Sequence, residues 1–215
     1  MSEPDLFSSC DGGVLALGEG AVVLCGFAAP EASILGAAVD AVAVAAPFRR
    51  MVTPGGFRMS VAMTNCGTYG WVSSENGYTY SSHDPASGRA WPEMPPVFAA
   101  LARRAAERAG FDDFEPDACL INRYEPGARL SLHQDKDEKD FSAPIVSVAL
   151  GVPAVFLFGG DRRKAATVRV PLAHGDVVVW GGPARLRYHG VAPLASGWHP
   201  FAGAHRLNLT LRKAR

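Results

Sequence analysis

The sequence lacks a long apolar run, a net charge and any cysteine motif, and each absence excludes a class of protein. Nothing in its 215 residues approaches the roughly 20 apolar residues of a membrane span, so we expect no membrane association. Its 21 basic residues balance its 21 acidic ones, which argues against a generic nucleic-acid coat protein. The four cysteines show no C-x-x-C and no zinc spacing, which predicts reduced thiols in a cytoplasm.

Charge is distributed unevenly along the chain. The first 48 residues contain no Lys or Arg, and the acidic segment 1–11 has the wrong charge for a signal or transit peptide. We therefore expect a cytoplasmic protein. Residues 161–215 hold ten Lys or Arg and only two acids, Asp161 and Asp176. This basic third either faces an anionic backbone, or binds small anions, or is a solvated surface.

The pattern of apolar residues predicts a single α+β unit that is mainly β. Helices are expected at 30–46 and 95–110, and a first strand at 21–27. Further strands are expected at 118–124, 130–134, 144–150, 153–158, 167–172, 176–181, 186–191 and 206–212. Eight short strands joined by Gly, Pro and Asp turns are typical of a double-stranded β-helix, or jelly roll, with supporting helices.

Residues 48–92 differ from the rest because tight turns and aromatic side chains alternate there. Asn76-Gly77 is a hairpin signal, and Trp71, Tyr78 and Tyr80 lie close to it. Such a segment is either a small aromatic core or a lid on which nucleic-acid bases stack.

A candidate metal site lies at His133-Gln134-Asp135. On an extended segment, residues two apart project to the same face, so an imidazole nitrogen and a carboxylate oxygen can share a cation. Alone, a surface His beside acids is the more common explanation. With His189 as a third ligand, the set becomes the two-histidine, one-carboxylate triad that suits non-haem Fe(II) and leaves coordination positions open.

The last expected strand, 206–212, alternates strictly between polar residues and leucine. If its polar face is outward, it is an ordinary solvated edge. If inward, Arg206 and Arg212 form an anion site for carboxylates, joined by Asn122 and Tyr124 from strand 118–124. Iron beside a dicarboxylate site implies 2-oxoglutarate, with its far carboxylate at Arg206.

Long motifs carry a resemblance to a known family. They include M-S-V-A-M-T-N-C-G, P-D-A-C-L-I-N-R-Y, L-S-L-H-Q-D-K-D-E and R-x-N-L-T-x-R. Over residues 48–212 the chain resembles the AlkB family of Fe(II)/2-oxoglutarate oxygenases. The resemblance implies a nucleotide-recognition lid (48–92) and a jelly-roll dioxygenase core (93–215), and we expect residues 1–47 to form an N-terminal strand and helix that support the core.

The resemblance also implies roles for individual residues. The iron ligands, which are also the catalytic residues, would be His133, Asp135 and His189. The 2-oxoglutarate pocket would comprise Asn122, Arg123, Tyr124, Arg206, Asn208 and Arg212. The substrate contacts would be Met63, Trp71, Tyr78, Tyr80, Asp137 and Arg163, with Arg162 and Lys164 as alternatives to Arg163.

The implied reaction is oxidative demethylation of alkylated bases in DNA, using Fe(II), 2-oxoglutarate and O₂ and releasing formaldehyde. The expected lesions are 1-methyladenine and 3-methylcytosine, with single-stranded DNA as the preferred substrate and double-stranded DNA and RNA as further candidates. We expect a monomer. The alternatives are the same chemistry on RNA or a methylated protein, and a non-catalytic jelly-roll binding module.

Overall fold

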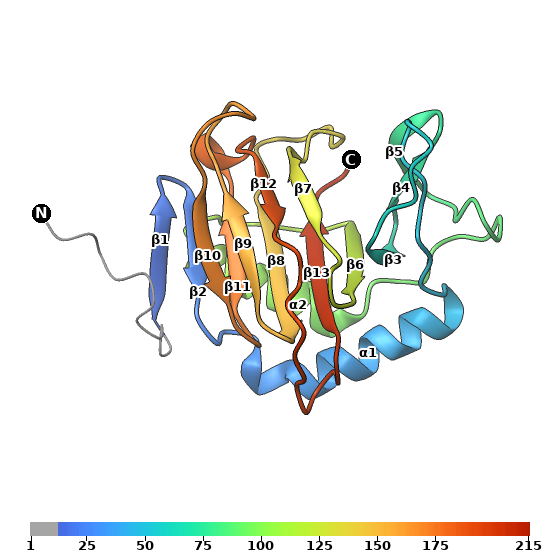
Figure 1. Cartoon of the computed structure of the whole chain (residues 1–215), viewed down its shortest axis with the longest axis horizontal. Coiled ribbons are helices and arrows are strands. Elements are labelled where there is room, and N and C mark those ends of the chain that lie inside the picture. Colours follow the sequence, from blue (N-terminus) through green and yellow to red (C-terminus); the bar gives the residue numbers. More distant parts are fainter. Residues whose placement is uncertain (1–12) are drawn as a thin grey trace, which may run out of the picture.

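In the part of the chain that the structure describes, two facing β-sheets backed by two helices form the core, and a third, two-stranded sheet lies beside them (Figure 1). The structure, a computed structural model, describes residues 13–215. Its helices are η1 (Ala29–Glu31), α1 (Ala32–Ala45), α2 (Pro96–Arg108) and η2 (Gly182–Ala184). Its strands are β1 (Val14–Gly18), β2 (Ala21–Leu24), β3 (Ala62–Gly67), β4 (Gly70–Ser74), β5 (Gly77–Ser81), β6 (Ala118–Tyr124), β7 (Leu130–His133), β8 (Ile145–Gly151), β9 (Ala154–Phe158), β10 (Val168–Leu172), β11 (Val177–Trp180), β12 (His189–Val191) and β13 (Arg206–Arg212).

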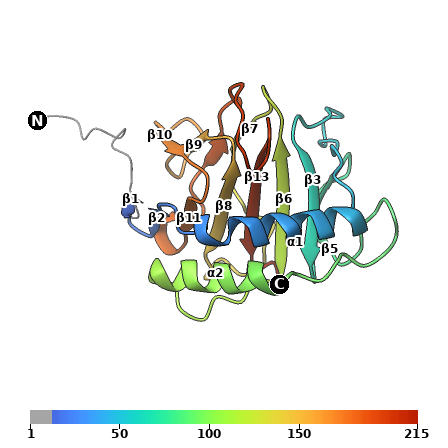
Figure 2. The ribbon, with the colours of Figure 1, turned by 90° about the horizontal axis from the view of Figure 1, so that it is seen from below.

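The larger sheet has seven strands in the order β1-β2-β11-β8-β13-β6-β3. Its central strand β8 is buried along its whole length, as expected for a β-branched run covered on both faces. One face packs against α1 and α2, which lie side by side beneath the sheet (Figure 2). Leu35 and Val39 of α1 and Phe98 and Leu101 of α2 fill that layer. The helices therefore hold the large sheet rigid and leave its other face for the site.

The smaller sheet, β10-β9-β12-β7, covers the opposite face of the large one. Phe156 and Phe158 of β9 meet Ile145, Val178 and Trp180 of the large sheet in a second apolar layer. The two sheets reproduce the expected jelly-roll core. Alternation along each strand places one set of side chains between the sheets, where a cavity opens at one end.

Within 48–92 the chain forms two different structures. Strand β3 pairs with β6 and extends the large sheet, whereas β4 and β5 form a separate two-stranded hairpin. Ser74 pairs with Gly77, so the two-residue loop is Glu75-Asn76, one residue earlier than the Asn-Gly signal suggested. Gly77 has φ of +129°, a conformation that favours glycine. The hairpin was correctly expected; its turn residues were not.

The expected strands agree with the observed ones to within three residues at either end, and the largest differences are at 21–27, where the strand ends at Leu24, and at 186–191. There only His189–Val191 is a strand, because Arg187 still bonds back to Ala184 in a turn that follows η2. Strand β1 was not expected from the sequence, because it is a half-exposed edge strand without a clear apolar pattern.

The structure bears on the expectations of reduced thiols and of no membrane association. Cys66 and Cys119 are buried free thiols, as expected. The expectation of reduced thiols is wrong for Cys25, which is disulfide-bonded; Cys10 lies outside the described residues. Among residues 13–215, no helix has the length and apolar character needed to cross a membrane.

Candidate active site

Two neighbouring strands of the small sheet bring the two histidines together. His133, the last residue of β7, pairs directly with His189, the first residue of β12, and their ring centroids lie 4.4 Å apart. The strands approach closely at Gly190, where any Cβ would lie 2.7 Å from the Leu130 carbonyl oxygen. A side chain at position 190 would therefore displace His189 from His133.

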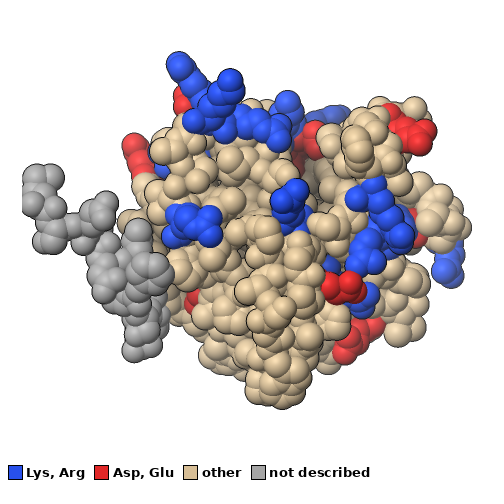
Figure 3. Space-filling view, viewed as in Figure 1, with Lys and Arg blue, Asp and Glu red and all other residues tan. Residues whose placement is uncertain are grey.

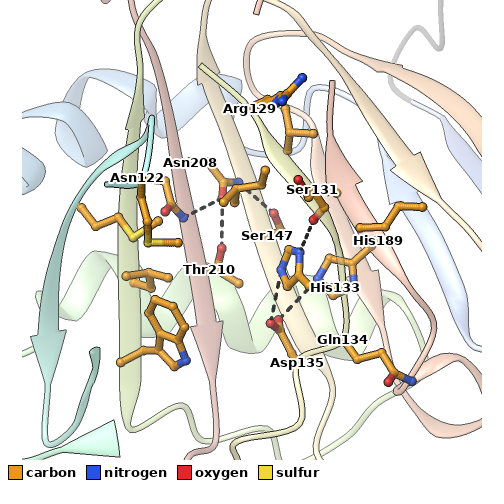
Figure 4. Close-up of a pocket in the computed structure, with 18 of the residues that line it drawn as sticks. Asn122, Arg129, Ser131, His133, Gln134, Asp135, Ser147, His189, Asn208 and Thr210 are labelled. Atoms are coloured by element: carbon orange, nitrogen blue, oxygen red, sulfur yellow. Dashed lines mark hydrogen bonds and ion pairs between the residues drawn. The ribbon is translucent and has the colours of Figure 1, made fainter. Parts of the chain in front are cut away.

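Asp135, just beyond β7, completes a cluster of three ligand groups (Figure 4). One carboxylate oxygen lies 3.6 Å from Nε2 of His133, and the other lies 3.6 Å from Nε2 of His189. All three donor atoms fall within 4.8 Å of one another. Two imidazoles and one carboxylate on one side of a cation leave its other side open, which suits a non-haem Fe(II) centre.

Hydrogen bonds orient both imidazoles toward Asp135. Nδ1 of His133 lies 2.8 Å from the carbonyl oxygen of Ser131, and Nδ1 of His189 lies 3.0 Å from that of Arg187. Each Nδ1 then carries the proton, which leaves the Nε2 lone pair free to bind a metal. Although His133 opens onto the cavity, burial among protein atoms and the neighbouring His189 lower its pKa to about 4. Its imidazole is therefore neutral near pH 7.

Arg212 of β13 holds the Asp135 carboxylate from the large sheet. Its Nη2 and Nε donate to the same carboxylate oxygen at 2.7 and 3.0 Å. Burial opposes ionisation of Asp135, but the charge of Arg212 overcomes it and holds the pKa of the carboxyl well below its ordinary value. Asp135 is thus an anion fixed in place, as a metal ligand requires.

The inner end of the cavity contains buried polar atoms that have no hydrogen-bond partner among residues 13–215. The cavity has a volume of about 760 Å³, and the side chain of Arg206 lines it while being 2% exposed. Arg206 Nε and Nη1, the Tyr124 hydroxyl and the Asn122 carbonyl oxygen all lack a hydrogen-bond partner. Burial also lowers the pKa of Arg206. An unpaired buried guanidinium is costly, so this end of the cavity fits a carboxylate.

Asn208 of β13 lies next to this pocket and is hydrogen-bonded on all sides. Its amide donates to Ser147 at 2.8 Å and to the Val148 carbonyl, and its oxygen accepts from Thr210 at 3.0 Å and from Asn122 at 3.4 Å (Figure 4). Since these contacts occupy its hydrogen-bonding groups, Asn208 positions Asn122 more than it offers groups to a ligand.

The outer end of the cavity is aromatic and charged. Trp71 of β4 stacks on Tyr78 of β5 with ring centroids 5.3 Å apart, and its indole nitrogen donates to Asp137 at 2.8 Å. Asn65 of β3 fixes the Trp71 backbone with two hydrogen bonds of 3.0 Å. Met63 lines the same cavity and is fully buried. The stacked pair leaves an aromatic wall beside the triad.

Basic side chains surround the mouth of the cavity. Lys and Arg gather along the upper rim and the right of the face in Figure 3. Those that line the cavity mouth are Arg58, Arg129, Lys136 and Arg163. Of the three candidates at 162–164, only Arg163 lines the cavity.

Two expected contacts do not reach the cavity. Arg123 lies on the opposite face of β6 from Asn122 and Tyr124, with its guanidinium over the ring of Phe48, because neighbours on a strand point to opposite sides. Tyr80 is 7% exposed and donates to Glu138 at 2.6 Å, since it faces inward from the hairpin. Neither residue is in position for the contact that the resemblance implied.

Several residues around the site were not expected from the sequence. Ser147 and Thr210 support Asn208, and their positions on β8 and β13 follow from the alternation that placed Asn208 inside. Glu138 and Arg185 lie buried behind Asp135. Their burial had no sequence signal, because both occur in loops without periodicity.

Facing sheets, a His-Asp-His cluster and a buried arginine beside it define a 2-oxoglutarate-dependent, non-haem iron enzyme. A family model, the 2OG-Fe(II) oxygenase superfamily, matches residues 20–212. Fe(II), 2-oxoglutarate and O₂ are therefore its cofactor and cosubstrates, and the expectation of an oxygenase is confirmed.

Within that superfamily the chain belongs to the AlkB family. It is 58% identical to the alpha-ketoglutarate-dependent dioxygenase AlkB of Salmonella typhimurium, with 92% of each chain covered. It is 56% identical to the enzyme of the same name from Escherichia coli, covering 98% of this chain and 97% of that one. A solved structure, OsALKBH1, superposes with a TM-score of 0.81 at 28% identity, over 93% of this chain and 99% of the other.

Proposed function

We propose that this dioxygenase removes methyl groups from alkylated bases in DNA, 1-methyladenine and 3-methylcytosine above all, and restores the normal base. One observation carries the proposal: the wall formed by Trp71 and Tyr78, with Asp137 beside it, shares a cavity with the His133, Asp135 and His189 cluster. An aromatic wall with a carboxylate suits a flat, positively charged ring next to the metal.

The proposed division of labour follows the cavity from its inner end outward. With iron bound by His133, Asp135 and His189, the centre supplies oxidation of an N-methyl carbon at the expense of 2-oxoglutarate and O₂. Arg206 and Tyr124 hold the far carboxylate of 2-oxoglutarate at the inner end. Arg212 keeps Asp135 ionised and in place. The protein thus supplies position and charge around the reacting methyl group.

Recognition of the damaged base rests on its charge. Methylation at N1 of adenine or N3 of cytosine blocks pairing and places a positive charge on the ring, so such a base costs less to extrude from a strand. Trp71 stacks on that cationic ring, and Asp137 favours it over a neutral base. Arg163 and the other basic residues at the mouth hold backbone phosphates without reading sequence. Because one chain contains every group, we also propose that the enzyme acts as a monomer.

The proposed reaction can be tested on a short single-stranded oligonucleotide that carries one 3-methylcytosine. After incubation with protein, Fe(II), 2-oxoglutarate and air, mass spectrometry should show the loss of one CH₂ unit, and none with His133→Ala. Succinate formation without this mass change would refute DNA demethylation and point to RNA or a methylated protein. If neither succinate nor the mass change appears, the iron-site assignment is refuted. The chain would then fit a non-catalytic jelly-roll binding module.

Substrate stacking can be tested at Trp71. For Trp71→Ala, we expect affinity for the methylated oligonucleotide to fall about 10- to 100-fold, because base–aromatic stacking contributes roughly 1–3 kcal/mol. Fluorescence anisotropy with a labelled strand would measure this, and Mn(II) affinity should stay at the wild-type value. Trp198→Ala is the matched control, since Trp198 is 71% exposed and does not line the cavity. Unchanged binding in Trp71→Ala would contradict the assignment.

A further inference from the structure

A buried ion pair lies directly behind the Asp135 carboxylate. The side chains of Glu138 and Arg185 are 2% and 3% exposed, and Nη2 of Arg185 lies 3.2 Å from a Glu138 oxygen. Arg185 follows η2, whereas Glu138 belongs to the loop after β7. Burying two charges is expensive and often contributes no net stability, so such a pair calls for an explanation other than stability.

Arg185 fixes the course of the loop that carries Asp135. Its Nη1 donates to the Asp135 backbone carbonyl at 2.7 Å, and its Nε donates to the Ala143 carbonyl at 3.0 Å. Together with Glu138, this single guanidinium contacts three points of the segment 135–143, which has no regular secondary structure of its own. The planar guanidinium of Arg185 donates to two carbonyls and faces the Glu138 carboxylate at the same time, which the ammonium of Lys cannot reproduce from the same place.

Glu138 connects the same loop to the hairpin and to β13. Its Oε1 accepts from the Tyr80 hydroxyl of β5 at 2.6 Å and lies 3.5 Å from Nε of Arg212. Arg212 in turn binds Asp135. Two acids and two guanidiniums therefore balance in one buried cluster, and Tyr80 ties the hairpin bearing Trp71 and Tyr78 to it. Glu138 therefore contacts both Tyr80 of the hairpin and the Arg212 guanidinium that binds Asp135.

We propose that Arg185 and Glu138 are positioning residues: Arg185 sets the place of Asp135 for the metal, and Glu138, through Tyr80, sets the aromatic wall over it. The proposal rests on the assignment of Asp135 as an iron ligand. Outer partners of metal ligands commonly change metal affinity 10- to 100-fold, roughly, because they orient the ligand. Neither residue needs to touch metal, cosubstrate or base.

The role of Arg185 can be tested by titrating the full chain with Mn(II) in the presence of 2-oxoglutarate, with EPR to count free ion. We expect affinity to fall about 100-fold in Arg185→Met and about 10-fold in Arg185→Lys, since Lys keeps the charge but not the three contacts. Arg169→Lys on the exposed part of β10 is the matched control. Thermal unfolding reports whether each variant is folded. If Arg185→Met does not fold, the Mn(II) affinity of Arg185→Lys tests the role of Arg185.

A substitution of Tyr80 tests the role of Glu138 independently of the role of Arg185. Tyr80→Phe removes only the hydroxyl, so we expect wild-type Mn(II) affinity but about 10-fold weaker binding of the methylated oligonucleotide. Folded Arg185 variants with wild-type Mn(II) affinity, or wild-type oligonucleotide binding in Tyr80→Phe, would overturn the respective half of the proposal. Failure of the unmodified chain to bind Mn(II) would instead overturn the iron-site assignment.

Discussion

Asp135→Asn is expected to abolish demethylation, lowering turnover by more than about a thousandfold. The substitution keeps the volume of the side chain but removes the only anionic donor of the described His-Asp-His cluster. Fe(II) would then face two neutral imidazoles and an amide, a much weaker ligand set. Succinate formation measures the loss of turnover, and Mn(II) titration shows whether it arises from loss of metal.

The same substitution should also destabilise the protein, for a reason independent of metal. Arg212 is buried and donates twice to Asp135, so an asparagine leaves its charge poorly compensated. Removing one partner of a buried pair typically costs about 3–5 kcal/mol. Urea denaturation of the metal-free protein should show this decrease in the free energy of unfolding.

A matched control shows whether the effects come from Asp135 itself or from the loss of any carboxylate. Asp40→Asn, on the exposed side of α1, removes one carboxylate far from the cavity and should leave both turnover and stability close to the wild type. Turnover by Asp135→Asn within tenfold of the wild type would contradict the assignment of Asp135. A normal urea midpoint would contradict the importance of its pairing with Arg212.

Arg206→Lys is expected to raise the KM for 2-oxoglutarate by about 100-fold, with a smaller effect on kcat. Arg206 presents two unsatisfied buried N–H groups, Nε and Nη1, to the inner end of the cavity. A guanidinium can donate to a bound carboxylate through more than one N–H group, whereas lysine offers a point charge. A charge-assisted hydrogen bond contributes roughly 1.5–3 kcal/mol, and each 1.4 kcal/mol changes affinity about tenfold.

The control for Arg206 comes from the neighbouring strand. Arg123→Lys makes the same chemical change on β6, but that side chain lies on the face away from the cavity, over Phe48. Its KM for 2-oxoglutarate should equal that of the wild type. Steady-state assays of succinate at varied 2-oxoglutarate measure both variants. An equal increase in both would show that the effect comes from strand packing, and no increase in Arg206→Lys would refute the carboxylate pocket.

Much of the site can be predicted from the sequence, because side chains along a strand point alternately to its two faces. The alternation in 206–212 is enough to place Arg206 and Arg212 on one face of their strand, and that in 118–124 places Asn122 and Tyr124 on one face of theirs. The spacing of His133 and Asp135 does the same for two of the ligands. Periodicity, however, says which residues share a face and not which face is inward. The choice between a solvated edge and a carboxylate pocket therefore depends on the second sheet, which covers the large sheet on the side of the cavity.

The resemblance to a family assigned roles to residues that local sequence patterns cannot assign. It also assigned ligand contacts to two residues that do not line the cavity. It named Arg123 and Tyr80 along with their neighbours, although each lies outside the cavity. For Arg123 the strand period itself gives the correction, because position 123 must point away from 122 and 124. For Tyr80 no such argument was available, since the direction of a hairpin's inward face depends on the loop it packs against.

The sequence by itself determined most of the elements, the triad of donor types and the chemistry that such donors support, because these depend on residue type and on spacing within a few positions. The tertiary structure alone decided that His133 pairs with His189, that Arg212 binds Asp135, and that only Arg163 of the run 162–164 lines the cavity. It also revealed Glu138 and Arg185 behind the site. These facts depend on how distant strands and irregular loops close on one another, and burial in a loop leaves no periodic trace in the chain.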